Sequence, residues 1–173
     1  FVPDTFRDKA YDDVALPIGH HQTLSQPSVV GIMSEALEVG DRMKVLEVGT
    51  GSGYQTAVLA HLARRVYTIE RHRPLMVKAE EMFAGLRLSN ITTKVGDGTL
   101  GWPEQAPFAR ILVTAAAADV PPVLADQLDA DGVMVVPVGH TEQSQIILRV
   151  RRLSDQFETE EIRQVRFVPL IPT

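Results

Sequence analysis

The chain has 173 residues, 45% of them hydrophobic and 23% charged, which fits one folded domain with a sizeable core. Its formal net charge of −5 argues against a nucleic-acid or membrane partner, and no apolar run is long enough to span a bilayer. The absence of cysteine excludes disulfides and thiolate chemistry and fits a reducing compartment, so we expect a cytoplasmic protein.

The first 25 residues divide into a helical stretch and an irregular one. Residues 1–13 predict a short helix anchored by Phe6 and Tyr11 and capped by Asp4. The segment from Val14 to Ser25 has no clean period and concentrates hydrogen-bonding rather than charged residues, which suggests a loop that contacts another group or molecule. Composition alone narrowly favours a plain surface connection. No signal peptide is recognisable, and since the chain does not begin with methionine we expect further residues in front.

The next element is an amphipathic helix that starts at Pro27. Its apolar residues recur at three- and four-residue steps as far as Leu37, Pro27 suits the first helical position, and Ser25 or Gln26 lies at the cap. Ser25 is therefore expected at a helix N-terminus, where an anion is favoured. A simple capping role for Ser25 is the more common alternative.

The centre of the chain reads as a strand, a glycine loop and a helix. Val45–Val48 is the apolar run of a buried parallel strand, and Tyr54–Leu62 reads as the following helix. Between them lie Gly49, Gly51 and Gly53, which permit a sharp turn and a close approach of ligand to backbone. This is the first half of a nucleotide-binding βαβ unit.

The spacing of the glycines favours a nucleoside over a dinucleotide. Tyr54 stands at the sixth position of the fingerprint, where a dinucleotide site has its third glycine. The next strand, Arg65–Glu70, ends in an acid about 20 residues beyond Gly49, the distance at which such an acid meets a ribose diol. A turn glycine set with a solvated Glu70 is the alternative, but the two signals in register favour a nucleoside site.

The rest of the chain continues the alternation of helices and strands. We expect a helix at Pro74–Leu88, a strand at Ile91–Val95, a strand at Phe108–Thr114, a helix from Pro121 through Leu128, a turn at Asp131-Gly132, a strand at Val133–Val138 and a hairpin of two strands at Ser144–Leu153 and Thr159–Pro169.

Two of the connections carry candidate ligand contacts. Asp97, in the polar turn after the third strand, can accept a hydrogen bond from an exocyclic amine such as that of adenine. The four alanines from Ala115 to Ala118 either let a substrate approach the backbone or pack a helix closely, and the two interpretations have equal weight. The neighbours His20 and His21 cannot both face one ion, and no other cluster has ligand spacing, so no metal is expected.

Several segments together resemble one family, the protein-L-isoaspartate O-methyltransferases, which use S-adenosylmethionine. The matching segments are Leu16–His20, Gln22–Pro27, Val45–Gln55, Tyr67–Glu70, Val95–Pro103, Thr114–Ala117 and Arg166–Leu170. The resemblance implies a Rossmann-like methyltransferase fold: a mainly parallel sheet with an antiparallel C-terminal hairpin and helices on both faces. We expect one domain over residues 1–173, with residues 1–40 as a substrate or cap segment, and we expect a monomer.

The resemblance also implies roles for individual residues. Ser25 matches the active-site serine; Gly49, Gly51 and Gly53 match the loop around the amino-acid part of the donor; Glu70 matches the ribose ligand. The full set implied for the S-adenosylmethionine site is Thr23, Leu24, Ser25, Glu47, Gly49, Thr50, Gly51, Ser52, Gly53, Glu70, Arg71, Asp97, Gly98 and Thr114. The set implied for the substrate is His20, Ser25, Ala115 and Ala116.

The implied reaction is methylation of the free α-carboxylate of an isoaspartyl residue in damaged proteins or peptides. That carboxylate is ionised at neutral pH, so no general base is required and the task is alignment and exclusion of water. Two positions depart from the family pattern: His21 stands where glycine is usual and Ala118 where proline is frequent. The alternatives are a nicotinamide-dependent oxidoreductase, a methyltransferase of RNA or a small molecule, and a non-catalytic donor-binding module.

Overall fold

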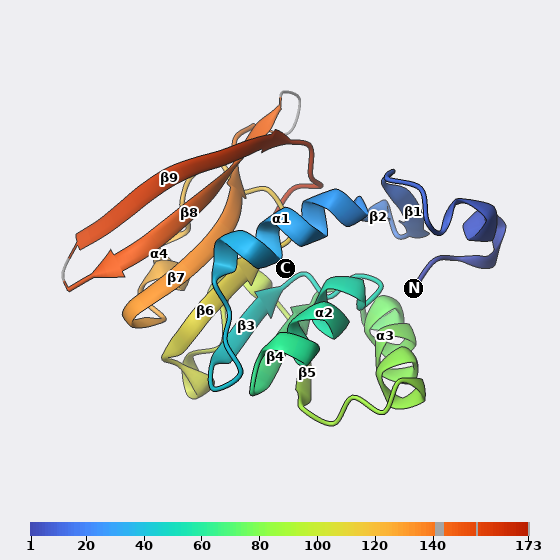
Figure 1. The fold of residues 1–173 in the computed structure, drawn as a ribbon, viewed down its shortest axis with the longest axis horizontal. Helices are drawn as coiled ribbons and strands as arrows, with labels where there is room; N and C mark the ends of the chain where they lie inside the picture. The colour runs from blue at the N-terminus through green and yellow to red at the C-terminus, as the bar shows by residue number, and fades with distance from the viewer. Residues whose placement is uncertain (141–143, 155, 173) are drawn as a thin grey trace.

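The structure is a computed structural model that describes residues 1–140, 144–154 and 156–172. Within these residues a seven-stranded sheet runs in the order β5-β4-β3-β6-β7-β8-β9 (Figure 1). The strands are β3 (Lys44–Val48), β4 (Arg65–Glu70), β5 (Ile91–Val95), β6 (Phe108–Val113), β7 (Leu128–Val138), β8 (Gln145–Leu153) and β9 (Gln156–Val165). Pairing is parallel from β5 to β7 and antiparallel from β7 to β9, which confirms the expected α/β class and its C-terminal hairpin.

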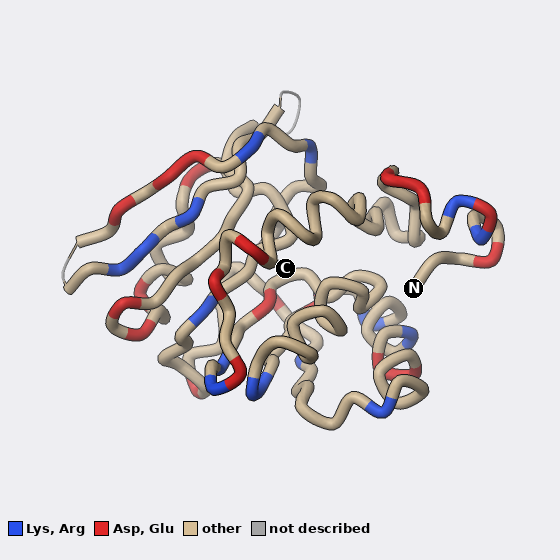
Figure 2. The backbone as a smooth tube through the Cα atoms, in the orientation of Figure 1, with Lys and Arg blue, Asp and Glu red and all other residues tan. Residues whose placement is uncertain are grey.

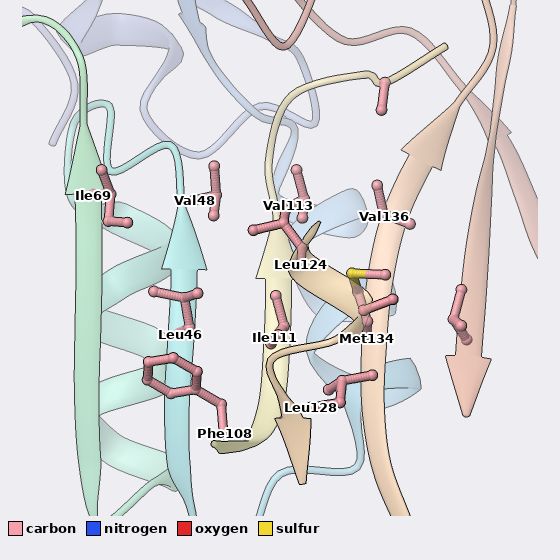
Figure 3. Close-up of a cluster of buried hydrophobic side chains, with 13 residues drawn as sticks. Leu46, Val48, Ile69, Phe108, Ile111, Val113, Leu124, Leu128, Met134 and Val136 are labelled. Atoms are coloured by element: carbon pink, nitrogen blue, oxygen red, sulfur yellow. The ribbon is translucent and has the colours of Figure 1, made fainter. Parts of the chain in front are cut away.

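Helices cover both faces of this sheet, but unequally. The helices are α1 (Pro27–Leu37), α2 (Tyr54–Leu62), α3 (Arg73–Gly85) and α4 (Pro122–Ala125), with 3₁₀ turns η1 (Asp4–Lys9), η2 (Gly98–Leu100) and η3 (Pro103–Gln105). On one face α1 and α2 bury Met33, Leu37 and Leu59 against β3, β4, β6 and β7. On the other face the short helix α4 buries Leu124 against Ile111 and Met134 (Figure 3).

The central strand β3 is buried on both faces, as its apolar composition predicts. Val45 packs with the α1–α2 cluster, whereas Leu46 and Val48 point to the opposite cluster, and all three are at most 2% exposed. This is the expected environment of an interior parallel strand. Because β3 lies between β4 and β6, the carboxyl ends of three parallel strands meet at one edge, where the strand order reverses direction.

The segment from Val14 to Ser25, which the sequence predicts as a loop, contains a short β-hairpin. Strands β1 (Leu16–Gly19) and β2 (Gln22–Leu24) pair antiparallel. The turn residues His20 and His21 both have left-handed φ angles, 52° and 57°. Such turns usually carry Gly, Asn or Asp, so two histidines conceal the signal. The left-handed φ of His21 also explains why glycine suits this position.

The N-terminal helix differs from the expectation in length and in its anchors. Residues 1–13 contain only the 3₁₀ turn η1, whose N-cap is Pro3, and no side chain caps it. Tyr11 is fully exposed and anchors nothing. The N-cap of α1 is Gln26, also without a side-chain cap; instead the carboxylate of Asp13 accepts a hydrogen bond from the backbone N–H of Ser28 at 2.9 Å.

The junction between α4 and β7 also differs from the expectation. The helix ends at Ala125, and Leu128 already belongs to β7, where it pairs with Phe108. The expected turn at Asp131-Gly132 is an irregularity inside β7: Asp131 has a φ of 59°, and the register shifts between the pairs of Phe108 and Arg110. A bulge uses the same residue types as a turn, which explains the wrong expectation.

The ends of two further elements shift by a few residues. Helix α3 stops at Gly85 rather than Leu88, and β9 covers Gln156–Val165 rather than Thr159–Pro169. Asp155, in the expected turn of the hairpin, lies outside the described residues. No helix among the described residues is long and apolar enough to cross a membrane.

Replacing a central core side chain should measure how much the sheet depends on this packing. Ile111 in β6 is 0% exposed, so Ile111→Ala should lower the free energy of unfolding by about 3 kcal/mol, from lost burial and the cavity left behind. Val77→Ala, on the exposed side of α3, is the control and should change it by less than about 0.5 kcal/mol. Urea unfolding measures both, and equal effects would contradict the core assignment.

Candidate functional site

A cleft lies at the carboxyl ends of β3, β4 and β6, and we call it the main cleft. Its walls come from β2 and the residues after it, the glycine loop, the end of β4, the start of η2, the end of β6 and the C-terminal segment. The lining residues are Gln22, Thr23, Leu24, Ser25, Val30, Val48, Gly49, Thr50, Gly51, Ser52, Tyr54, Gln55, Ile69, Glu70, Arg71, Gly98, Thr114, Ala115, Val168, Pro169, Leu170 and Ile171.

The glycine loop is held between the neighbouring strands by backbone hydrogen bonds. Gly49 N–H donates to Ile69 O at 2.8 Å, and the Thr114 hydroxyl donates to Gly49 O at 2.6 Å. A Cβ at Gly49 would lie 2.3 Å from the Thr114 hydroxyl, and its φ of 98° favours glycine. Gly53, expected in the donor site, is outside the lining, because its missing side chain leaves room for the Phe83 ring of α3.

Glu70 lies in the wall of the main cleft at the end of β4. It is 5% exposed, and its two oxygens accept hydrogen bonds from the backbone N–H groups of Gly51 and His72, both at 2.9 Å. These bonds fix the carboxylate and tie the glycine loop to the start of α3. An ionised carboxylate has about four acceptor positions, so Glu70 keeps capacity for the hydroxyls of a ribose.

Ser25 lies where the main cleft meets a second hollow, which we call the side groove. The side groove is lined by Ala15, Thr23, Ser25, Gln26, Val29, Arg163, Gln164, Val165, Arg166 and Phe167. Thr23 and Ser25 line both spaces. A ligand in the main cleft and a second molecule in the side groove would therefore both contact these two residues.

Glu47 does not reach the main cleft, although the resemblance places it with the donor. It is 0% exposed and points to the same side of β3 as Val45. The hydroxyls of Thr56 and Thr68 donate to its Oε2 at 2.5 and 2.6 Å, and among the described residues its Oε1 has no partner. Thr68 in turn lies 2.6 Å from the hydroxyl of Thr50, which does line the cleft. Glu47 is thus connected to the cleft through two threonines.

Burial raises the pKa of Glu47 to about 7, although the hydrogen bonds from Thr56 and Thr68 oppose this shift. The cause is the loss of water around the charged form, which is more costly than the two hydroxyl contacts can offset. The carboxyl therefore keeps its proton to a higher pH than an ordinary glutamate does.

Three further expected residues are not among the lining residues. Asp97 accepts from the backbone N–H and the hydroxyl of Thr99 and so caps η2, while its neighbour Gly98 is in the wall. His20 stacks on His72 with ring centroids 5.3 Å apart. Ala116 holds the C-terminal segment through two backbone bonds of 2.8 Å, donating to Val168 O and accepting from Leu170 N–H. The other expected residues line the main cleft.

Several lining residues were not expected from the sequence. Tyr54 and Gln55 begin α2 directly after the glycines, and Gln55 is buried and donates to the Ser34 hydroxyl at 2.9 Å. The segment Val168–Ile171 carries a family motif but no local pattern that predicts a cleft wall. Among the described residues, no group of three or more His, Cys, Asp or Glu side chains is arranged to hold a metal ion.

A cleft at the reversal of a mainly parallel sheet, followed by an antiparallel C-terminal hairpin, defines a Rossmann-like methyltransferase class. The family model described as Protein-L-isoaspartate(D-aspartate) O-methyltransferase (PCMT) matches residues 1–173, and the chain belongs to this family.

Relatives and solved structures agree with this assignment. The chain is 58% identical over 173 residues to the protein-L-isoaspartate O-methyltransferase of Rhodospirillum centenum, covering 99% of this chain and 78% of the relative. It is 61% identical over 171 residues to that of Paracoccus denitrificans, covering 99% and 79%.

A solved protein-L-isoaspartate O-methyltransferase matches with a TM-score of 0.83 and 27% identity, covering 92% of this chain and 53% of the other. A Plasmodium falciparum protein solved in complex with S-adenosyl-L-homocysteine shares the fold, with a TM-score of 0.81, 22% identity and coverage of 94% and 82%.

The buried carboxyl of Glu47 should make stability depend on pH. Its folded pKa of about 7 exceeds the ordinary value of 4.5, so the folded state holds the proton more tightly than the unfolded state. The stability relative to Glu47→Gln is therefore greatest below pH 4.5. It should fall by about 3 kcal/mol between pH 4.5 and about pH 7, at about 1.4 kcal/mol per pH unit, and change little at higher pH.

Urea unfolding of the native protein and of Glu47→Gln between pH 5 and pH 8 measures this difference. Glu81→Gln, at an exposed position of α3, is the matched control for the loss of a carboxylate. Parallel pH profiles of the native protein and Glu47→Gln would show that Glu47 does not titrate in this range.

Proposed function

We propose that this chain transfers a methyl group from S-adenosylmethionine to the free α-carboxylate of L-isoaspartyl residues in damaged proteins and peptides. Its membership of the family supports the reaction class. The observation that carries the proposal is the position of Ser25 at the junction of two spaces, one suited to a nucleoside and one open to a second molecule. A group-transfer enzyme requires such a meeting point.

The residues of the main cleft fit S-adenosylmethionine. Glu70 would hold the ribose hydroxyls, Gly98 would border the adenine, and the loop from Gly49 to Ser52 would contact the amino-acid part of the donor. The donor supplies a methyl group on a positively charged sulfur, which is a strong electrophile. The chain binds and orients it, and the apolar walls Val48, Ile69 and Leu170 keep water away.

The acceptor carboxylate requires orientation rather than activation. An α-carboxyl has a pKa of roughly 3.5, so it is ionised and nucleophilic at neutral pH. The hydroxyls of Ser25 and Thr23 would hold it at the border of the main cleft. A normal aspartyl side chain would carry its carboxylate at a different distance from the backbone, and this offset would supply selectivity.

The arrangement also supports a single functional unit. Residues 1–40 contribute Gln22, Thr23, Leu24, Ser25 and Val30 to the main cleft, and the later strands contribute the remainder. We therefore propose residues 1–173 as one methyltransferase domain, with residues 1–40 as the cap segment. Because one chain supplies all these walls, we propose a monomer. The cytoplasmic location and the absence of a nucleic-acid partner stay predictions from composition.

Removing the Ser25 hydroxyl should separate catalysis from donor binding. Ser25→Ala should lower kcat on an isoaspartyl peptide by about a hundredfold, because the acceptor loses an orienting hydrogen bond, and leave the Kd of S-adenosylhomocysteine within about threefold. Transfer of labelled methyl and calorimetry measure the two quantities. Ser89→Ala, exposed before the amino end of β5, is the control. Unchanged turnover would remove Ser25 from the mechanism.

The role of Glu70 predicts a loss of donor affinity. Glu70→Gln keeps the shape of the side chain but loses the charge, so the Kd of S-adenosylhomocysteine should rise by about tenfold or more. Calorimetry with S-adenosylhomocysteine and with NAD also distinguishes the proposed methyltransferase from an oxidoreductase that would bind NAD at the same glycine loop. Tight NAD binding by the native protein would contradict the assignment.

A further inference from the structure

The side groove is lined by two arginines, and neither has a role in the proposed methyl transfer. Arg163, near the end of β9, and Arg166, just beyond it, both line the side groove, and both are exposed. No Asp or Glu is among its described lining residues. The whole chain has a net charge of −5, so the positive charge of this wall is opposite in sign to that of the chain.

The tube view makes the separation of charges visible. Figure 2 shows blue segments at the end of β9 and in the chain after it, apart from the red stretch earlier on the same strand. That red stretch contains Glu158, Glu160 and Glu161, and Arg149 of β8 forms an ion pair with Glu160. Glu160 is therefore engaged with Arg149, and none of these three acids lines the side groove.

One carboxylate faces this wall from the segment before α1. The backbone N–H and side chain of Ser28 lower the pKa of Asp13, and Arg163 contributes to this shift through its charge. The Asp13 carboxylate is thus committed to the start of α1, which leaves the two guanidinium groups in excess over one carboxylate.

The path of the substrate leads past this wall. With the donor in the main cleft, an isoaspartyl carboxylate must enter at Thr23 and Ser25, which border the side groove. The peptide chain on one side of the isoaspartyl residue then lies in the side groove. A residue next to the reacting one comes within reach of the two arginines.

We infer that the side groove is a subsite for a second carboxylate, carried by a peptide residue close to the isoaspartyl residue and bound by Arg163 and Arg166. The inference rests on the proposed function. Guanidinium groups bind carboxylates through paired hydrogen bonds, which gives both affinity and orientation. Such a subsite selects damage sites flanked by acidic residues. The carboxylate has two chemical sources: an acidic side chain, or the C-terminus of a short peptide.

A set of matched peptides tests this subsite. Three of the peptides have an amidated C-terminus and one isoaspartyl residue. In the first, Gln stands on both sides of the isoaspartyl residue; in the second, Glu precedes it; in the third, Glu follows it. A fourth peptide has Gln on both sides and a free C-terminal acid two residues on. The measured quantity is kcat/KM with S-adenosylmethionine at 50 mM salt. We expect one Glu peptide to exceed the Gln peptide by about fivefold, mostly through KM.

The variants then assign the preference to the two arginines. In Arg163→Gln and Arg166→Gln the ratio between the Glu and Gln peptides should fall, and in the double variant it should approach one. Because each ratio compares two peptides on the same variant, a loss of folded protein cancels. Arg42→Gln removes an exposed charge before the amino end of β3, at the opposite edge of the sheet, and should keep the full ratio.

The outcomes separate the subsite from the proposed function. A preference for the free-acid peptide over both Glu peptides, lost in the double variant, supports the subsite and identifies the C-terminus as its carboxylate. Equal kcat/KM for all four peptides would overturn the subsite while leaving the methyl transfer intact, as would a preference that survives the double variant. Absence of turnover with every peptide would overturn the proposed function and the subsite with it.

Discussion

The register of β3 between its two parallel neighbours is the constraint on which the site depends. Backbone bonds from Gly49 N–H to Ile69 O and from Thr114 N–H to Val48 O fix the three carboxyl ends at one level. The glycine loop, Glu70 and Thr114 therefore face one space. A shift of β3 by one residue would turn Val45 and Leu46 to the wrong faces and move Glu47 out of its threonine pocket. Packing and binding are thus fixed by the same alignment.

The parts that the sequence predicts are those with local signals. A known spacing relates the buried strand, the three glycines and the acid at the end of β4. This spacing predicts the place of the main cleft from the sequence. The hairpin of β1 and β2 could not, because His20 and His21 occupy turn positions in which glycine or asparagine is the usual signal. The side groove depends on a contact between residues far apart in sequence, which no local pattern encodes.

Glu47 lies next to the glycine loop, as the motif predicts, but its side chain does not reach the main cleft. An acid beside a glycine loop resembles a ligand-binding group, yet alternation along β3 sends its side chain to the helix side with Val45. There it meets Thr56 and Thr68 rather than a ligand. A buried acid with one unpartnered oxygen costs stability, and its link to Thr50 is the feature through which it bears on the cleft.

The segment from Arg163 to Ile171 forms a wall of both spaces, since its first part lines the side groove and its last part lines the main cleft. It is pinned at Phe167 by Gln145 and at Val168 and Leu170 by Ala116. Local opening of this single stretch would remove a wall from the main cleft and from the side groove at once. A molecule bound in either space would therefore rest on the same stretch of chain as a molecule bound in the other.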